Sequence, residues 1–126
     1  MRFAFAAALA AASAAPLAAY RDHNRVLVVS AVRPDDPALA RQRAFFAAMG
    51  RQAQARDLIL VEAVGNDARA RGMRAALGLK GAFAAALIGK DGETKLVSSH
   101  PLDAATLFAL IDSMPMRRQE RRERGE

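Results

Sequence analysis

A continuous apolar run near the start of the chain sets the strongest limit on what this sequence can fold into. The residues NRVLVVSAVRP, from Asn24 to Pro34, are rich in valine and do not alternate between polar and apolar side chains. A strand with one face in solvent alternates, so this run indicates a strand that is covered on both faces. It predicts a central, parallel strand that ends at Pro34, in a sheet with helices on both sides.

The residues after this run carry the signals of a helix start. Asp36 suits the N-cap, Pro37 suits the first helical position, and Asp35 lies near the positive end of the helix dipole. We expect the helix to run to about Met49 or further, weakened by Gly50. Its apolar face contains Leu39, Phe46, Met49 and Ala53.

A second strand and a second helix follow. The stretch RDLILVEAVGND predicts a buried strand over Leu58–Val64. Asn66 or Asp67 can cap the next helix, and Gly78 is placed to end it. Two such units in succession predict a parallel strand pair with a right-handed crossover. The second helix carries Ala70, Met73 and Leu77 on its apolar side.

The pattern then changes to a hairpin and a last helix. Strands are predicted over Phe83–Ile88 and Thr94–Ser98, because the Asp-Gly of the intervening turn, Gly89–Gly92, adopts a positive φ easily. A helix follows between its N-cap, Asp103, and Pro115. The complete order βαβαββα predicts one α/β domain with a central mixed sheet flanked by helices, without internal repeat or linker. The last helix carries Leu107, Leu110, Ile111 and Met114 on one face.

The first residues, MRFAFAAALAAASAAPLAAY, have the layout of a secretory signal peptide: one basic residue, an alanine-rich apolar stretch and then small residues. Cleavage is expected at Ala12-Ser13-Ala14 or at Leu17-Ala18-Ala19, and Pro16 disfavours cleavage directly after Ala15. We therefore predict a signal peptide over residues 1–19, a periplasmic or secreted location, and no transmembrane segment in the mature protein. The alternative is an amphipathic or membrane-anchoring helix, although so short an alanine-rich run spans a bilayer poorly.

The sequence contains no cysteine. This excludes an acylated lipoprotein anchor, a disulfide, a thiolate zinc site and thiol redox chemistry. An exported domain without disulfides is held together by apolar burial.

The chain is basic, with 19 Lys and Arg against 13 Asp and Glu. Such a balance suits acidic partners such as nucleic acid, anionic lipid headgroups or polysaccharide. Residues 117–126 contain five arginines and three glutamates, and we interpret them as a charged Arg/Glu-rich tail after a domain over residues 20–116. Because Glu120 and Glu123 lie three or four residues from arginines, the tail equally suits a solvated helical extension with ion pairs. Aromatic residues are not interleaved with these charges, which argues against stacking on nucleic acid.

The element order resembles the thioredoxin fold. More narrowly, the stretches RVLVVSAVRPDDPALARQ, LIGKDGETKLVSS and LFALIDSMPMRRQE resemble a family of small secreted bacterial proteins known only as a domain of unknown function. That family is related to the peroxiredoxin-like DUDES domain of vertebrate extracellular-matrix proteins. The resemblance covers about Arg25 to Glu120, and its most specific pieces are D-D-P at Asp35–Pro37, G-K-D-G at Gly89–Gly92 and M-P-M-R-R at Met114–Arg118. It implies an exported thioredoxin-like domain without established chemistry.

Redox-active members of the wider fold place a thiolate at the first strand-to-helix junction, where the helix N-terminus lowers its pKa. Here that junction is Arg33–Pro37, without cysteine. The segment Leu79–Phe83 also lacks the proline that such enzymes place opposite the thiol. Disulfide exchange and thiol-based peroxide reduction are therefore not available to this chain.

The remaining polar residues suggest binding more than catalysis. Asp35 and Asp36 do not face each other at a helix start, where a carboxylate is stabilised as the anion, so capping explains them better than acid–base work. Arg33 is expected to pair with a carboxylate or to bind a terminal anion. Lys90 is interpreted as a turn residue on a solvated hairpin tip; the alternative is that Lys90, Lys95 and the terminal arginines form one basic face.

The histidines and serines give no catalytic pattern. His23 and His100 alone do not make a transition-metal site, and Ser98 and Ser99 lack the glycine elbow of a nucleophile. A polar strand end before Pro101 explains these residues better.

We expect no catalytic residue, metal or cofactor, and a non-catalytic domain that binds an envelope or extracellular protein. The alternatives are an oxidoreductase-related protein of peroxiredoxin or thioredoxin ancestry and a basic adhesion module for anionic polymers or lipid headgroups. The candidate partner-binding residues are Arg33, Asp35, Asp36, Lys90, Lys95, Arg117 and Arg118.

Overall fold

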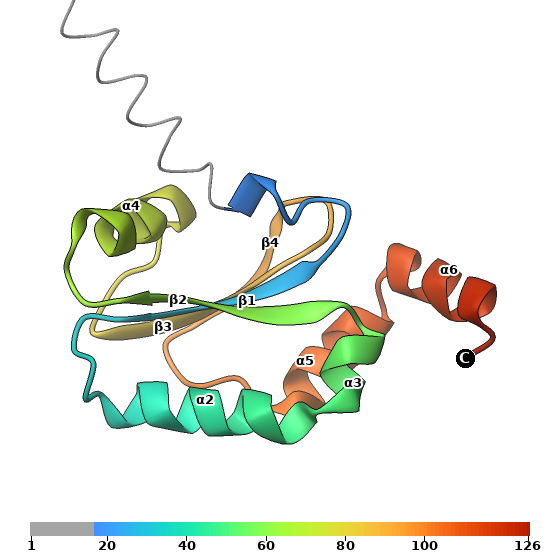
Figure 1. Cartoon of the computed structure of the whole chain (residues 1–126), viewed down its shortest axis with the longest axis horizontal. Coiled ribbons are helices and arrows are strands. Elements are labelled where there is room, and N and C mark those ends of the chain that lie inside the picture. The colour runs from blue at the N-terminus through green and yellow to red at the C-terminus, as the bar shows by residue number, and fades with distance from the viewer. Residues whose placement is uncertain (1–16) are drawn as a thin grey trace, which may run out of the picture.

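A four-stranded mixed sheet forms the centre of the computed structural model, which describes residues 17–126 (Figure 1). The strand order is β2-β1-β3-β4. β1 runs parallel to β2 and antiparallel to β3, which pairs antiparallel with β4. The predicted α/β class and mixed sheet are confirmed, and the arrangement is consistent with a thioredoxin-like fold. The strands are β1 (Arg25–Ala31), β2 (Leu58–Val64), β3 (Phe83–Ile88) and β4 (Thr94–Ser98).

Helices cover both faces of this sheet (Figure 1). α2 (Pro37–Met49), α3 (Arg51–Ala55) and α5 (Ala104–Asp112) lie on one face, and α4 (Ala68–Leu77) lies on the other. α6 (Pro115–Arg124) stands beside one end of the sheet. Gly50, with φ at 51°, separates α2 from α3, so the predicted weak point is a helix boundary.

Side-chain caps begin three of these helices where the sequence predicts them. Asp36 accepts a hydrogen bond from the amide of Ala38 at 2.9 Å. Asp67 and Asp103 cap α4 and α5 in the same way, at 2.8 and 2.9 Å. Gly78 ends α4 in the left-handed conformation with φ at 66°, which glycine adopts without steric penalty. These local signals therefore position α2, α4 and α5.

Apolar residues of the sheet fill a separate core on each face. All seven residues of β1 are buried, as the apolar run predicts for a central strand. β2 has the predicted bounds, but it is only half-buried along most of its length and not buried as expected, because it lies at the sheet edge and has one neighbouring strand. The core under α2 and α5 contains Leu27, Val29, Leu39, Leu87, Leu107 and Ile111. The core under α4 contains Val26, Val28, Met73, Ala84, Ala86 and Ile88.

A short turn before β1 also packs on the α4 face. Leu17 and Tyr20 are partly buried against that core. The predicted signal peptide lies outside the described residues as far as residue 16, and its last three residues, 17–19, belong to this turn. No helix within residues 17–126 has the length and apolar character needed to cross a bilayer.

Candidate functional site

The two ends of the sheet carry different groups of the predicted partner-binding residues. Since β1 and β2 are parallel, their carboxyl ends meet beside the start of β3, where Ala31 pairs with Val64 and Phe83. Their amino ends meet beside the end of β3 and the hairpin. The carboxyl end carries Arg33, Asp35 and Asp36, and the amino end carries Lys90, Lys95, Arg117 and Arg118. The structure therefore does not bring the seven residues together into one surface.

At the carboxyl end, the β1–α2 junction projects into solvent. The Arg33 guanidinium binds both carboxylate oxygens of Asp35, at 3.1 and 3.0 Å, and the two side chains are 77% and 70% exposed. The predicted pairing of Arg33 with a carboxylate is confirmed. Asp36 is occupied as the cap of α2, as predicted. The junction therefore presents an exposed ion pair and no acid–base dyad.

An apolar residue, Val32, adjoins this ion pair and is 40% exposed. Its amide donates to the carbonyl of Ala82 at 3.0 Å, which joins the junction to the loop before β3. Lys80, Gly81 and Ala82 of that loop are exposed as well. The sequence interpretation missed Val32 as a surface residue because it continues the apolar run of β1.

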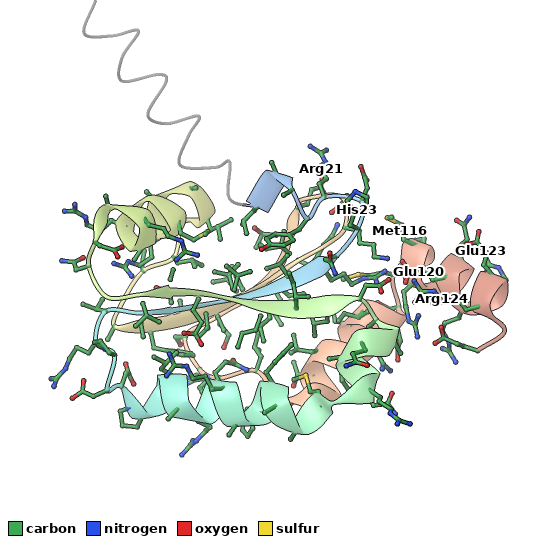
Figure 2. All side chains as sticks on the ribbon, viewed as in Figure 1. Arg21, His23, Met116, Glu120, Glu123 and Arg124 are labelled. Atoms are coloured by element: carbon green, nitrogen blue, oxygen red, sulfur yellow. The ribbon has the colours of Figure 1, made fainter. Side chains whose placement is uncertain are left out.

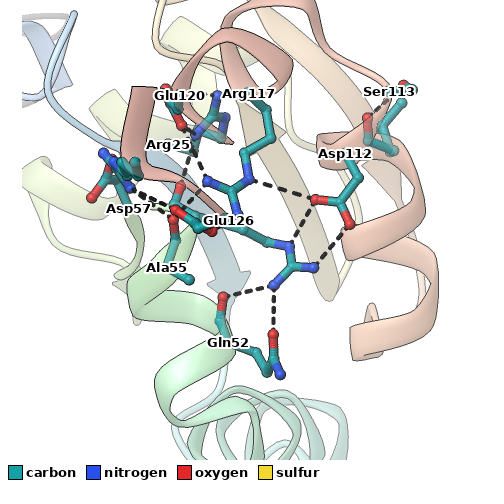
Figure 3. A network of polar contacts seen from close by, with 12 residues as sticks. Arg25, Gln52, Ala55, Asp57, Asp112, Ser113, Arg117, Glu120 and Glu126 are labelled. Atoms are coloured by element: carbon teal, nitrogen blue, oxygen red, sulfur yellow. Dashed lines mark hydrogen bonds and ion pairs between the residues drawn. The ribbon is translucent and has the colours of Figure 1, made fainter. Parts of the chain in front are cut away.

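At the amino end, buried cations meet carboxylates from distant parts of the chain (Figure 3). Arg25, the first residue of β1, is 1% exposed and binds both carboxylate oxygens of Glu120 in α6, at 3.0 and 3.2 Å. The Lys90 ammonium lies between the carboxylates of Glu120 and Asp57, at 2.6 and 2.8 Å. These contacts hold the hairpin, the start of the sheet and α6 together. Sequence reasoning had no signal for them, because residue type alone does not identify a partner 95 positions away.

The same face of α6 contacts the end of α3. The carbonyl oxygen of Ala55 accepts hydrogen bonds from Arg117 and Arg124, each at 2.9 Å. Arg124 also binds Asp57 at 2.7 Å, and Arg117 binds Glu126 at 2.6 Å. In Figure 2, Glu120 and Arg124 lie on the side of α6 that faces the rest of the molecule, whereas Glu123 points away.

A neighbouring ion pair joins α3 to α5. Arg56 binds both oxygens of Asp112, at 3.0 and 2.9 Å. The guanidinium carbon of Arg56 also lies 3.9 Å from the ring centroid of Phe108, close enough for a cation–π interaction. Together, the contacts of Arg25, Arg56, Lys90, Arg117 and Arg124 with Asp57, Asp112, Glu120 and Glu126 form what we call the α6 network.

The carboxylates of the α6 network are held ionised. Burial opposes the ionised form of Glu120, but hydrogen bonds from Arg25 and Lys90 outweigh it and place the pKa of Glu120 below its ordinary value. Burial acts against Asp57 in the same way, and hydrogen bonds from Lys90 and Arg124 lower its pKa. The pKa of Asp112 is also lowered: burial raises it, but the hydrogen bond from Arg56 and the charges of Arg56, Arg117 and Arg121 together outweigh burial. The α6 network is therefore an assembly of charged groups at neutral pH.

This arrangement corrects two interpretations of the basic residues. Lys90 does not lie on a solvated tip, because it is 7% exposed and bound to two carboxylates. Lys90 and Arg117 are both buried in the α6 network, and Lys95 pairs with Asp91 and Glu93, so the predicted basic face does not form from these residues. Arg118 is exposed and makes no ion pair with the described residues.

Residues 117–126, predicted as a charged tail, belong largely to α6, which begins at Pro115. The helical extension is present, and Arg117 lies 3.7 Å from Glu120 at the expected i,i+3 spacing. The inner side of the helix, however, docks on the domain through the α6 network.

Ser98 and His100 form a simple turn at the end of β4, whereas His23 lies in the turn before β1, where its amide donates to the carbonyl of Tyr20. The Ser98 hydroxyl donates to the carbonyl of His100 at 2.8 Å and accepts from the His100 amide at 3.0 Å. This contact makes the polar strand end that the sequence predicts. Within residues 17–126, no group of three or more Asp, Glu or His side chains is placed to hold a metal ion.

The fold and the junction together define a class: an α/β domain of thioredoxin-like arrangement whose first strand-to-helix junction carries an arginine–aspartate pair and no thiol. Within that class, the chain belongs to the family described as Domain of unknown function (DUF4174), whose model matches residues 16–120. The match includes Arg25, Asp57, Lys90 and Glu120 of the α6 network and ends before Arg124 and Glu126. A comparison with curated proteins found no match.

Proposed function

We propose that this chain is an exported, non-catalytic domain that binds another protein through the carboxyl end of its sheet. The observation that carries the proposal is the exposed β1–α2 junction, where Val32 lies beside the solvent-facing Arg33–Asp35 pair. An apolar side chain next to an ion pair suits recognition of a protein, because the partner can cover the valine and hydrogen-bond to the charged groups.

The chemistry of the junction supports binding over thiol catalysis. A thiol at this position would be activated by the start of α2, but the chain contains no cysteine. Asp36 is occupied by the α2 cap, and Asp35 is held by Arg33. Neither carboxylate is buried or paired with another carboxylate, which are the arrangements that raise a pKa toward neutrality for proton transfer.

The amino end of the sheet is less suited to a partner, since its cations are already bound to carboxylates of the same chain. Export rests on the signal-peptide layout of the first residues. Descent from a redox-active thioredoxin-like ancestor, and kinship with the DUDES domain, rest on the sequence resemblance and would account for such a fold without its thiol.

The test uses a photo-crosslinking amino acid in the full-length chain, expressed in the cells that naturally contain it. Placed at Val32, it should give an adduct of defined mass that disappears when R33E and D35R are introduced together. Val97 is the matched control, because it is a valine that is 50% exposed on β4. Adducts that are the same from both positions, or no adduct from Val32, would contradict the proposal.

A second candidate function is adhesion to anionic polymers. It is favoured by the outer part of α6, where Arg118, Arg121 and Arg122 are exposed and make no ion pair with the described residues. Retention on an anionic polysaccharide column should then weaken steeply with salt and fall in R118Q/R122Q. Turnover of a disulfide or a peroxide by the purified protein would instead support an oxidoreductase.

A further inference from the structure

The turn before β1, residues 17–24, is an ordered part of the domain, held by backbone hydrogen bonds. The amide of Tyr20 donates to the carbonyl of Leu17 at 3.1 Å, and the amide of Arg21 donates to the carbonyl of Ala18 at 3.3 Å. The Tyr20 carbonyl in turn accepts from the amides of His23 and Asn24, at 3.0 and 2.8 Å. Residues 17–24 therefore form a hydrogen-bonded turn that leads directly into the central strand.

This turn is fastened to the hairpin as well. The amide of Asp22 donates to the carbonyl of Lys90 at 2.7 Å. The side chain of Arg21 lies close to Gly92, where an added Cβ would come within 3.6 Å of it. The segment is thus attached to hairpin residues that lie about seventy positions later in the chain, Lys90 and Gly92.

Leu17 and Tyr20 cover apolar surface that α4 leaves open. Both pack against the core on the α4 face, which includes Val26, Met73 and Ile88. Between this turn, α4 and the hairpin lies a pocket of about 350 Å³, and Leu17, Ala18 and Tyr20 form one of its walls. Removing residues 17–19 would take away Leu17 and part of that wall, and would expose apolar side chains to water.

The two cleavage sites that the sequence offers differ in their effect on this turn. Cleavage after Ala19 deletes Leu17 and two of the carbonyl acceptors described above, whereas cleavage after Ala14 leaves the turn complete. The residue types favour the same choice. Ala12-Ser13-Ala14 has small residues at both recognition positions, but Leu17-Ala18-Ala19 has a leucine at the first of them.

From the two observations together we infer that signal-peptide cleavage occurs after Ala14, so that the mature protein begins at Ala15 and keeps residues 17–19 as part of its fold. The inference rests on the proposed export and deepens it by assigning the processing site. Residues 12–15 themselves lie outside the described part of the chain.

The test is the intact mass and N-terminal sequence of the full-length gene product, measured separately in the cytoplasmic, envelope and secreted fractions of cells that express it. A start at Ala15 is expected. A start at Tyr20 would overturn the inference and leave export standing, whereas a protein that keeps Met1 would overturn both. The two failures are therefore distinguishable.

A matched pair of variants sharpens the result. Ala14→Tyr places a bulky side chain at the expected cleavage site and should make the uncleaved precursor accumulate several-fold. Ala19→Tyr changes an exposed position and should leave the start at Ala15. Blocked processing in Ala19→Tyr, with normal processing in Ala14→Tyr, would contradict the assignment.

Discussion

Glu120 is the residue on which the docking of α6 depends most. Its carboxylate is the shared anion for Arg25 and Lys90, both of which are nearly inaccessible to water. Removing one partner of a buried ion pair leaves an uncompensated charge, which is far more destabilising than losing an exposed pair. The strength of this site therefore comes from the burial of the cations rather than from the number of ion pairs.

Glu120→Gln should lower the free energy of unfolding by about 3 kcal/mol, because Arg25 loses its anion and Lys90 keeps only Asp57. Urea denaturation at neutral pH measures the change. The control is Glu123→Gln on the outer side of the same helix, where the carboxylate accepts a hydrogen bond from Gln119 and makes no ion pair with residues 17–126. Equal stability of the two variants would contradict the role assigned to Glu120.

Acid should destabilise the protein through the same carboxylates. The folded-state pKa values of Asp57, Asp112 and Glu120 lie below their ordinary values of 3.8, 3.8 and 4.5, so the unfolded state binds protons first as the pH falls. Their stabilising effect is complete above these ordinary values and is lost progressively as the pH falls through the folded values. The urea midpoint should therefore drop below about pH 5, and the drop should be shallower in Glu120→Gln. An unchanged pH profile in that variant would argue against the linkage.

At the scale of elements, the helix starts are the features that local sequence determined best. A cap is a local contact, in which a side-chain oxygen accepts from a free amide two or three residues later, so it does not depend on distant residues. The caps of α2, α4 and α5 are of this kind and are made by Asp36, Asp67 and Asp103. α6 is different, since Met114 at its N-cap provides no side-chain hydrogen bond. Its position depends on tertiary ion pairs.

Asp36→Ala should cost about 1 kcal/mol of stability through loss of the α2 cap. Asp35→Ala should leave stability nearly unchanged, because the ion pair that Asp35 makes with Arg33 is exposed to solvent. Thermal melts of the two variants, side by side, separate a capping role from a binding role. If Asp35→Ala lost stability as strongly as Asp36→Ala, the junction would be a structural feature rather than a free surface.

Across the whole molecule, the sequence predicted the features that depend on residues close along the chain and missed the contacts between residues far apart along it. The apolar run of β1, the Asp-Gly hairpin and the caps led to the correct order of the four strands and of α2, α4 and α5, and to a mixed sheet, but not to the separate helices α3 and α6. The interpretation of Lys90 failed because a turn signal describes backbone conformation and does not reveal that α6 will cover the hairpin. Val32 was missed for a similar reason: apolar character predicted that it would be buried, but the strand ends one residue earlier.

Local stability should differ between the buried strands of the sheet and α6. β1 and β3 are buried along their whole length, whereas α6 contributes no residue to either apolar core and is held mainly by charged contacts. An element with few buried apolar contacts opens locally at a lower free energy than the whole domain needs to unfold. Hydrogen exchange at neutral pH should therefore find the slowest amides in β1 and β3 and much faster exchange in α6.

Glu120→Gln should accelerate exchange in α6 further and leave the pattern in α4 unchanged, because α4 packs on the core around Met73 and Ala70. Uniform acceleration across α4 and α6 would mean that α6 unfolds only with the rest of the domain.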